Sequence, residues 1–600
     1  MSVSAVLSAS LRKGQNLRII AIVTFFFFLA SISQYQGSFE FSIDSDGQVH
    51  SIPSEASDHD IYYTHHIATY NPKDIKPWTR GDTRALETPE GQKVAEFLTA
   101  SPLLKTTSAT GPNAGKSNTS GADVKLADNA FLHLSKRLRV FRGLWHSLKD
   151  YYDQLEDEDQ QDQFYSHPQP PLELFQKMEQ TLFPWLLKSY RTSFDLHLET
   201  TKDTRPTGSG WGTVKNRGIV MCVGNKHSVF ARTTIKVLRE ILESKLPIEI
   251  YYAGDQDLSK KNRDWFEQIQ DLVLVDITKK LDQDILQISG PIIKPFAMLV
   301  SRFREVILMD SDAYFLQDPA ILFEDGGYKE VGTVFFYDRT VPKKVAGVNK
   351  RAWLDSFLPS VSNHPSKTRW FRSKGDQDQD SGVVVLDKKT HFLGLLAICK
   401  MNDALERNQA TYRATWGEKE SFWIGMEMIQ ERYSFVRFGG GVIGDLGDAV
   451  PYKQDDKSLN PADANENDNS SPITSSSSPV RMDRVCGNQL HFNYKGQPLW
   501  WNSGLVRDKT TYNSPYLKYT AWMRDEHGVW DIEHSCLVPT FHGALMEVEW
   551  NQRQTAFEIL RLDQAVAQEL NQPKIKNILT IPRLVKTEGA KGGKGNNEAV

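Results

Sequence analysis

The sequence contains few cysteines and no excess of basic residues. Its four cysteines lack the spacing of paired metal ligands, which argues against a zinc site built on them. In an oxidising compartment they could form disulfides in any of three pairings. The chain has 71 Lys and Arg against 75 Asp and Glu, a formal net charge of −4, so a nucleic-acid partner is not expected. The cysteines are Cys222, Cys399, Cys486 and Cys536.

Long apolar runs are also scarce. The one membrane signal is "IIAIVTFFFFLASI" (residues 19–32), whose 14 residues fall short of the about 20 that span a bilayer as a helix. A basic tail ending at Arg18 precedes it, which predicts a cytosolic N-terminus. Ser31 and Ser33 are compatible with a cleaved signal peptide, but we favour an uncleaved type II anchor because Arg18 can snorkel and early secretory membranes are thin. Both alternatives place the remaining chain in the lumen or outside the cell.

The composition changes along the chain and divides it into segments. Residues 34–125 are rich in Ser, Thr, Gly and Pro, which predicts a flexible stem. Apolar residues recur at helical spacing from Phe131 to Leu148, which predicts an amphipathic helix. Residues 453–479 are polar and Ser-rich, as is typical of a disordered insertion. We predict a cytosolic tail (1–18), an anchor (19–33), the stem (34–125), a helical neck (126–215), a catalytic domain (216–550) and a C-terminal extension with a tail (551–600).

Short apolar strands alternate with helical patterns from Gly218 onward. This alternation predicts an α/β domain with a Rossmann-like, mostly parallel sheet that continues to about Trp550. In such sheets ligands bind at the carboxyl ends of the strands. The expected strands are 218–225, 247–254, 272–277 and 305–309, and the expected helices are 228–244, 260–270 and 294–304.

The tripeptide Asp-Ser-Asp occurs twice, at Asp44–Asp46 and at Asp310–Asp312. The second copy directly follows the apolar strand 305–309, so its two carboxylates are delivered together at the end of a strand. Two carboxylates that point the same way can share one divalent cation, which commonly binds substrate phosphates. The alternative is that they only cap the following turn. The first copy lies in the predicted stem, where nothing preorganises it, so we assign it no site.

Two later segments favour the metal-site interpretation. Asp380, Ser381 and Gly382 stand just before another buried strand, and the glycine permits close approach of the backbone to a ligand. Ser381 occupies the position where a calcium loop needs glycine, so calcium is rejected there. Further on, "CGNQLHFNYKGQPLWWN" carries His491 near two tryptophans. These suit a third metal ligand and a platform for a sugar ring, although a lone histidine is more often structural.

Eight blocks between Arg217 and Asn502 form an ordered set: "GIVMCVGN", "LPIEIYYAGDQDLS", "IKPFAMLVSRFREVILMDSDAYFLQDP", "GTVFFYDRT", "DSGVVVLDKKTHFLGLLAICKMN", "GEKESFWIGMEM", "GGGVIGDLGD" and "CGNQLHF…GQPLWWN". In this order they resemble the fungal Golgi α-mannosyltransferases, particularly the α-1,3-mannosyltransferase group. The resemblance implies a GT-A nucleotide-diphospho-sugar transferase fold, GDP-mannose as donor, Mn²⁺ as cation and transfer with retention.

The resemblance also implies roles for individual residues. Asp310 and Asp312 would bind the cation, with His491 as a late third ligand. Asp380 and Glu418 would be the catalytic carboxylates; Glu418 replaces the Asp that is usual in its block, which leaves open which carboxylate contacts the donor and which the acceptor. The donor-binding positions would be Gly224, Asn225, Lys294, Asp310, Ser381 and Gly382.

The expected partner is a mannose-containing glycan on a protein, with no nucleic acid involved. The family resemblance implies a single-pass Golgi membrane protein with a lumenal catalytic domain, and an oligomer with itself or with other mannosyltransferases stays open. Two alternatives remain: an α-1,2-mannosyltransferase of the same family, and a catalytically silent member that binds glycans or assembles complexes. A metal-dependent phosphohydrolase would need more His and Asp at strand ends than the sequence offers.

Overall fold

The computed structural model describes residues 41–43, 49–51, 65–75, 88–100, 103–105, 124–126, 130–152, 170–201, 216–340, 349–358, 360–372, 374–451, 481–506 and 514–570. The chain divides into two units, Met1–Thr64 and His65–Val600. In the first, β1 (Phe41–Ile43) pairs antiparallel with β2 (Val49–Ser51). The predicted tail, anchor, 453–479 insertion and residues 571–600 lie outside the described residues. None of the described helices is both long and apolar enough to cross a membrane.

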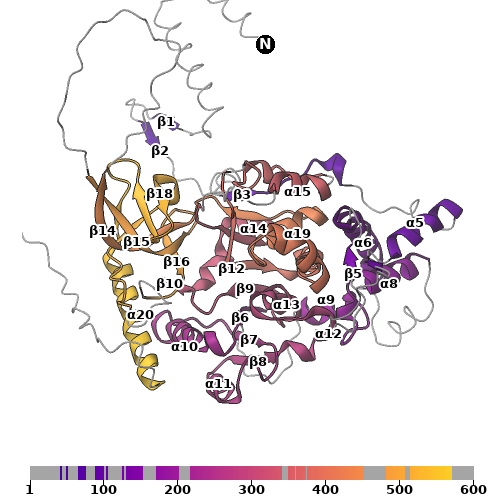
Figure 1. Ribbon diagram of the computed structural model, residues 1–600, viewed down its shortest axis with the longest axis horizontal. Coiled ribbons are helices and arrows are strands. Elements are labelled where there is room, and N and C mark those ends of the chain that lie inside the picture. Colours follow the sequence, from indigo (N-terminus) through magenta and orange to yellow (C-terminus); the bar gives the residue numbers. More distant parts are fainter. Residues whose placement is uncertain are drawn as a thin grey trace, which may run out of the picture. The chain divides into compact units, whose positions relative to one another are not determined.

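A central sheet organises the second unit (Figure 1). Its strand order is β3-β13-β11-β12-β9-β6-β7-β8, and the four strands from β9 to β8 run parallel, as the sequence predicts. β12 runs antiparallel to both β9 and β11. The strands are β3 (His65–Ile67), β6 (Arg217–Cys222), β7 (Ile248–Tyr252), β8 (Leu272–Asp276), β9 (Glu305–Met309), β11 (Thr333–Tyr337), β12 (Gln379–Asp387) and β13 (Ser434–Val436).

Both faces of this sheet are buried, which explains why its strands read as continuous apolar runs. In β9, Val306 and Leu308 pack into one apolar cluster while Ile307 and Met309 pack into another on the opposite face. The first cluster includes helices α13 (Ile293–Val300), α16 (Lys388–Met401) and α19 (Ser421–Ile429). The second includes α10 (Ser228–Lys236) and α11 (Lys260–Phe266), and Figure 1 shows the two groups on opposite sides. The α/β class expected from the sequence is confirmed.

The predicted neck forms helices that join the first cluster. Phe141 stacks on Phe175 with ring centroids 4.7 Å apart, and Trp145 stacks on Phe194 at 4.3 Å. Arg142 donates to the carbonyl of Ile429 at the end of α19 (2.8 Å), which ties the neck to the domain. The neck helices are α6 (Ala130–Tyr152), α8 (Pro170–Leu182) and α9 (Ser193–Thr201), and α5 (Pro89–Thr99) precedes them in the chain. α5 and β3 fall within the predicted stem, so parts of that segment pack on the domain.

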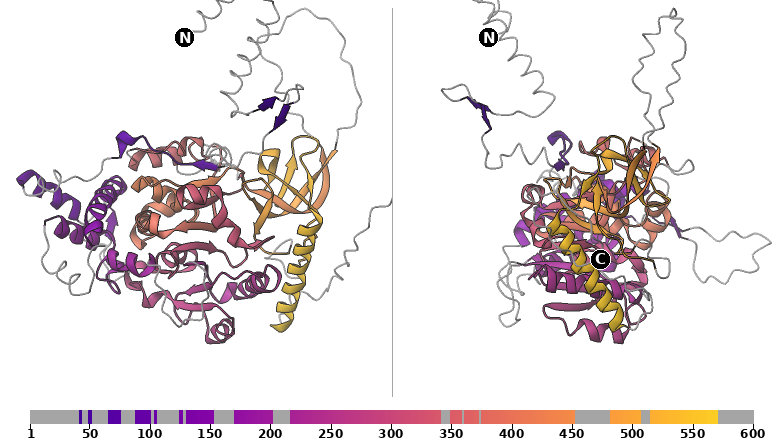
Figure 2. Two further views of the ribbon diagram at one scale, coloured as in Figure 1. Left: turned by 180° about the vertical axis from the view of Figure 1, so that it is seen from behind. Right: turned by 90° about the vertical axis from the view of Figure 1, so that its left-hand side faces the viewer.

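A second, antiparallel sheet follows the first, whereas the sequence predicted one Rossmann-like sheet up to Trp550. It has the order β10-β16-β15-β14-β17-β20, with β19 paired to β15 and β18. A disulfide joins Cys486 to Cys536, and Cys222 and Cys399 are free. Helix α20 (Trp550–Glu569) packs against this sheet and α10, as Figure 2 shows. The strands are β10 (Tyr314–Phe315), β14 (Gly441–Pro451), β15 (Arg481–Phe492), β16 (Pro498–Asn502), β17 (Ala521–Met523), β18 (Gly528–Asp531), β19 (Cys536–Pro539) and β20 (Met546–Glu547).

Candidate active site

The two acidic motifs of the sequence meet where β9 ends and β12 begins. β12 runs antiparallel to β9, with Val383 opposite Met309, so the start of one strand lies beside the end of the other. The backbone N–H of Asp310 donates to the carbonyl of Gly382 at 2.8 Å. The structure therefore brings Asp-Ser-Asp and Asp-Ser-Gly together at the carboxyl edge of the parallel strands, where the sequence placed the site.

Lys294 connects the carboxylates of this edge. Its ammonium nitrogen lies 2.8 Å from Asp310 Oδ1 and 3.1 Å from Glu418 Oε1. Ser381 donates its hydroxyl to Glu418 Oε1 at 2.8 Å. The side chains of Lys294 and Glu418 are 10% and 3% exposed, and that of Asp310 is 24% exposed. Asp310 is thus the member of this group that solvent or a ligand can reach most easily.

The pKa values of this cluster are shifted because the carboxylates of Asp310 and Glu418 are packed around the ammonium of Lys294. Burial raises the pKa of Asp310 to about 7, Lys294 opposes this rise, and the nearby Asp312 adds to it. Burial alone would lower the pKa of Lys294, but Asp310 and Glu418 raise it above its usual range. Because Asp312 adds to the rise in the pKa of Asp310, a divalent cation beside these two carboxylates would be stabilising. Asp310 and Asp312 therefore fit the predicted cation in their donor chemistry.

His491 is differently engaged. Its Nε2 lies 2.9 Å from Asp380 Oδ2, and its ring stacks on Trp500 with centroids 4.0 Å apart. The side chains of His491 and Asp380 are almost fully buried. Within the described ranges, no group of three or more His, Cys, Asp or Glu is arranged to hold a metal ion. His491 as a third ligand beside Asp310 and Asp312 thus stays a prediction that this arrangement does not itself display.

Asp380 is held ionised despite its burial. Burial would raise the pKa of its carboxyl, but Lys419, His491 and the backbone N–H of Gly382 hold it well below its usual range. Gly382 donates that N–H to Asp380 Oδ1 at 2.7 Å. A permanently negative group at this edge is suited to stabilise positive charge that develops on a substrate.

Two glycines at the site are there because neighbours approach closely. A Cβ on Gly382 would lie 2.6 Å from Asn502 Nδ2, and one on Gly224 would lie 2.5 Å from Asp257 Oδ1. Asn225 accepts from the backbone N–H of Ser259 at 2.9 Å and lies at the end of β6. Gly224 and Asn225 thus occupy the same carboxyl edge, while the contacts that fill their surroundings come from the protein itself.

The expected sugar platform is wrong. Trp500 and Trp501 are both fully buried, and Trp500 packs against His491 and Phe336. The indole of Trp500 belongs to an apolar cluster with strands of the central sheet, and that of Trp501 belongs to the cluster between the antiparallel sheet and α20. An apolar residue in a strand looks the same in the sequence whether it faces a core or a ligand, so the error has a simple cause.

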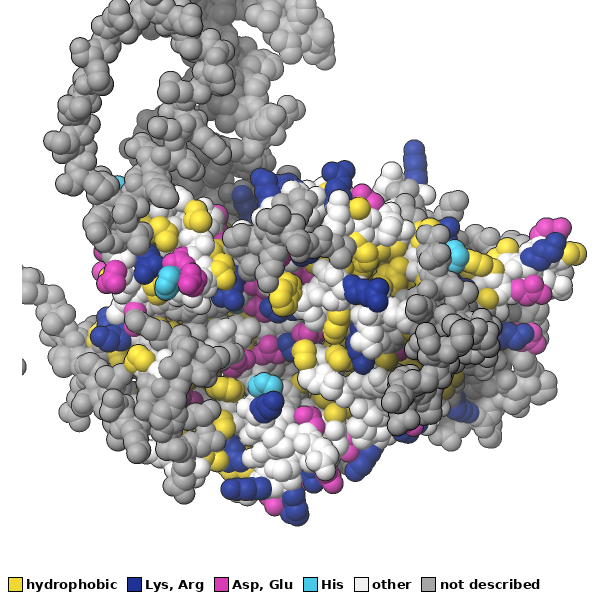
Figure 3. Space-filling view, viewed as in Figure 1, with side chains coloured by type: hydrophobic (Ala, Val, Ile, Leu, Met, Phe, Trp, Pro, Cys, Tyr) yellow, Lys and Arg dark blue, Asp and Glu magenta, His cyan; other side chains and the backbone are white. Residues whose placement is uncertain are grey.

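Sequence reasoning missed a buried network next to Asp380. Lys419 lies 3.1 Å from Asp338 Oδ2, and Gln489 donates to Asp338 Oδ1 at 2.8 Å. Asp338 comes just after β11 and Lys419 stands beside Glu418 in the "GEKE" block. The position of Asp338 at a strand end was the available signal. Figure 3 shows acidic side chains gathered near the middle of this face, in the region of β9, β12 and β16.

The comparisons with known proteins agree with the motifs. Residues 216–472 match the family described as "Mannosyltransferase putative". The "Putative alpha-1,3-mannosyltransferase MNN14" of Candida albicans is 28% identical over 356 residues, covering 54% of this chain and 49% of that protein. The "Alpha-1,3-mannosyltransferase MNT3" of Saccharomyces cerevisiae is 25% identical over 328 residues, covering 50% and 48%. These matches confirm the resemblance. They support the assignment of this chain to a fungal mannosyltransferase family and its classification as a glycosyltransferase.

Two further matches are an α-1,2-mannosyltransferase and a solved structure. The "Alpha-1,2-mannosyltransferase MNN5" of S. cerevisiae is 24% identical over 273 residues, covering 37% of this chain and 44% of that protein. Among solved structures, the Mn/GDP form of "Core-mannan synthase A (CmsA/Ktr4) from Aspergillus fumigatus" aligns with 13% identity and a TM-score of 0.23, covering 39% of this chain and 75% of that chain. The chain spans about half the length of these α-1,3-mannosyltransferase relatives.

Proposed function

We propose that the protein is a Golgi type II membrane glycosyltransferase of the GT-A class. It transfers α-mannose from GDP-mannose to mannose residues of protein-linked glycans, with retention and with α-1,3 linkage. One observation carries the proposal: the buried Lys294 pairs with both Asp310 and Glu418 at the carboxyl edge of the sheet. This cluster lies within the residues that match the mannosyltransferase family.

Each residue has a role that follows from its place. A divalent cation, which we take to be Mn²⁺, would be held by Asp310 and Asp312 and would neutralise charge on the leaving diphosphate. Lys294, the buried cation of the group, adds positive charge at the same edge. Gly224, Asn225, Ser381 and Gly382 are the proposed donor contacts. Asp380, held ionised, would stabilise the positive charge that develops on the mannose ring as the bond to phosphate breaks.

The acceptor hydroxyl attacks the anomeric carbon as the bond to the phosphate oxygen breaks, and its proton leaves to a base. Retention can arise from attack on the face of the leaving group, with a phosphate oxygen as that base. It can also arise from two displacements in which a carboxylate is the first nucleophile. Ser381 and Lys294 both contact Oε1 of Glu418, so these contacts are compatible with either route.

Two alternatives differ in what they predict. An α-1,2-mannosyltransferase would use the same donor and give a different linkage, because linkage depends on how the acceptor is held. A catalytically silent glycan binder would have no need for Lys294, a buried cation set between two carboxylates. The retained Asp310, Asp312 and Lys294 therefore favour an enzyme.

The test uses the purified full-length chain in detergent. It is incubated with Mn²⁺, a series of mannoside acceptors and, in separate reactions, GDP-mannose, UDP-glucose and UDP-galactose. We expect transfer from GDP-mannose only, and NMR of the product should show an α-1,3-linked mannose. An α-1,2 linkage would select the first alternative. No transfer from any donor, with mannoside binding intact, would select the second.

A further inference from the structure

A cavity of about 350 Å³ lies outside the candidate active site, between the neck and the end of α16. We call it the neck pocket and define it by six of its lining residues: Thr181, Gln287, Lys400, Asp403, Glu406 and Asn408. Its size is in the range of small-molecule sites. None of the six belongs to the proposed donor or metal set, so the pocket needs an explanation of its own.

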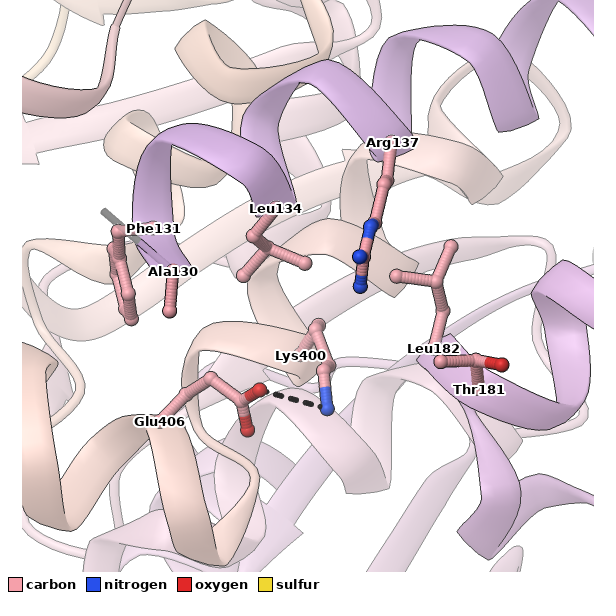
Figure 4. Close-up of a pocket in the computed structure, with 8 residues that line it drawn as sticks. All are labelled: Ala130, Phe131, Leu134, Arg137, Thr181, Leu182, Lys400 and Glu406. Carbon is pink, nitrogen blue, oxygen red and sulfur yellow. Dashed lines mark ion pairs between the residues drawn. The ribbon is translucent and has the colours of Figure 1, made fainter. Parts of the chain in front are cut away.

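The pocket contains a buried cluster of charges. Lys400 lies 2.9 Å from Glu406 Oε1 and 3.0 Å from Asp403 Oδ2, and each of these side chains is at most 6% exposed. A smaller space beside it, of about 10 Å³, is lined by Arg137 and shares Thr181, Lys400 and Glu406 with the neck pocket. Figure 4 shows Arg137 from α6 pointing toward the Lys400–Glu406 pair. The two spaces therefore share one set of polar side chains.

Two atoms of this cluster are incompletely bonded. Glu406 Oε2 and Arg137 Nε are buried and have no hydrogen-bond partner among the residues that the structure describes. Glu406 is 2% exposed and Arg137 is 4% exposed. Leaving such a group unsatisfied costs about 1–3 kcal/mol, so buried polar atoms of this kind need a partner. The inner space has room for about one water, which could serve one atom, while the larger pocket remains to be filled.

The charges of the pocket select a neutral ligand. The charged side chains that line the neck pocket are Lys400, Asp403 and Glu406, and Lys400 pairs with both acids. Burial raises the pKa of Glu406 to about 7, so the lining carries little net charge with which to attract a phosphate or a cation. A hydroxyl group donates and accepts at once, which matches the orphan carboxylate oxygen of Glu406 and the side-chain amides of the lining. The remaining lining combines the side chains of Gln287 and Asn408 with apolar groups, Pro184, Ile285, Ala404 and Leu405. A sugar presents the same combination of hydroxyl edges and apolar C–H faces.

The backbone around the pocket is unusual, and it connects to the candidate active site. Asn408 lies in a π-helix, Arg407–Thr411, and such segments occur frequently at functional sites. Asn402 precedes Asp403 and donates to Ser421 Oγ at 2.8 Å. Ser421 in turn donates its N–H to the carbonyl of Glu418 at 3.0 Å. These hydrogen bonds connect the residue next to Asp403 with the backbone of Glu418, whose carboxylate pairs with Lys294.

We propose that the neck pocket is a saccharide subsite that holds a distal mannose unit of an oligomannoside acceptor. The choice of mannose rests on the proposed function, whereas the preference for a neutral polyhydroxylated ligand rests on the pocket. An acceptor held at this second point would be recognised by its length as well as by its terminal residue.

The test fills the pocket from its exposed rim and spares the buried ion pairs. Gln287→Trp and Asn408→Trp replace exposed residues of the lining, and Gln270→Trp is the matched control at an exposed position outside it. Binding of α-linked mannotetraose to the full-length chain in detergent is measured by calorimetry without any nucleotide sugar. Each tryptophan should remove one or two hydrogen bonds to the ligand, so we expect binding to be about tenfold weaker in both pocket variants. The control should bind mannotetraose as the wild-type chain does.

Kinetics separate this proposal from the proposed function. With GDP-mannose, the pocket variants should raise KM about tenfold for mannotetraose and leave KM for methyl α-mannoside unchanged. Absence of transfer by the wild-type chain would overturn the proposed function, while weaker mannotetraose binding in the pocket variants would still support the subsite. Wild-type affinity for mannotetraose in both pocket variants, or no binding by the wild-type chain, would overturn the subsite.

Discussion

His491 Nε2 and Asp380 Oδ2 lie 2.9 Å apart, and this contact joins the two sheets of the protein. Asp380 belongs to β12 of the central sheet, and His491 belongs to β15 of the antiparallel sheet. Both side chains of the pair are buried, and the His491 ring stacks on Trp500. The second sheet therefore helps to build the candidate active site, because it supplies the group that orients one of the proposed catalytic carboxylates.

The role of His491 can be read from its metal dependence. If His491 is a ligand of the cation when the cation is bound, His491→Gln should raise the Mn²⁺ concentration for half-maximal activity by about tenfold or more, in the range seen for changes around metal sites. Activity is measured across a titration of Mn²⁺, and His534→Gln, which changes an exposed histidine, is the control. A loss by the same factor at every Mn²⁺ concentration would show that His491 serves only to hold Asp380.

Removal of the central cation should destabilise the protein. Lys294→Met leaves Asp310 and Glu418 buried without their counter-charge, so we expect a loss of about 3–5 kcal/mol in the free energy of unfolding. Denaturant unfolding in metal-free buffer measures it. Lys260→Met removes an exposed pair with Asp264 and should cost at most about 0.5 kcal/mol. Equal effects of the two substitutions would mean that the Lys294 cluster is not buried in solution.

A buried carboxyl in the neck should make the free energy of unfolding fall as pH rises from about 4.5 to about 7. Burial raises the pKa of Glu179 to about 7 from its usual 4.5, and its carboxylate accepts from the N–H of Ser193 at 2.6 Å. The folded state therefore binds this proton more tightly, so stability contributed below pH 4.5 is lost as pH rises to about 7. The shift corresponds to about 3 kcal/mol.

Glu179→Gln isolates this effect, because it keeps the acceptor and removes the titration. The free energy of unfolding is compared at pH 5 and pH 7.5, and the wild-type chain should lose about 2 kcal/mol more than the variant between them. Glu173→Gln changes an exposed carboxyl in the same helix and should behave as the wild type. Identical pH dependence in the wild type and Glu179→Gln would contradict burial of this carboxyl.

The single disulfide should stabilise the antiparallel sheet. Cys486 and Cys536 face each other on β15 and β19 and are 50 residues apart in the sequence. Closing a loop of that length predicts that Cys486→Ser costs about 2–4 kcal/mol. Thiol titration of the chain unfolded without reductant should find two free thiols, those of Cys222 and Cys399. Four free thiols, or none, would contradict the pairing.

Local pattern was enough to predict the centre of the fold. The apolar runs that became β6, β7 and β9 are buried on both faces, so they are recognisable without knowledge of their neighbours. The edge strand β8 is mostly half-buried, yet its run is apolar enough to be recognised as well. For the same reason the position of Asp310 after β9 could be predicted. The meeting of Asp310 with Gly382 depends on β12 running antiparallel to β9, which no local pattern specifies.

Long-range pairing explains what the sequence did not reveal. β3 is three residues long and joins the sheet only through β13, nearly 370 positions later, so it has no periodicity of its own. In the antiparallel sheet, β10 pairs with β16 across more than 180 positions and β14 pairs with β17 across about 80. Likewise, Asp338, Lys419 and Gln489 come together from three separate segments. Whether Trp500 faces a sugar or a core depends on that assembly.

The most direct measurement compares the two copies of Asp-Ser-Asp. Mannose transfer from GDP-mannose with Mn²⁺ is measured for the full-length wild type, Asp312→Ala and Asp46→Ala, each checked for equal folding. We expect Asp312→Ala to lower kcat by about 10²–10³-fold or more, as loss of charge stabilisation at the leaving group predicts, and Asp46→Ala to match the wild type. Wild-type transfer by Asp312→Ala, or loss of transfer in Asp46→Ala, would contradict the account.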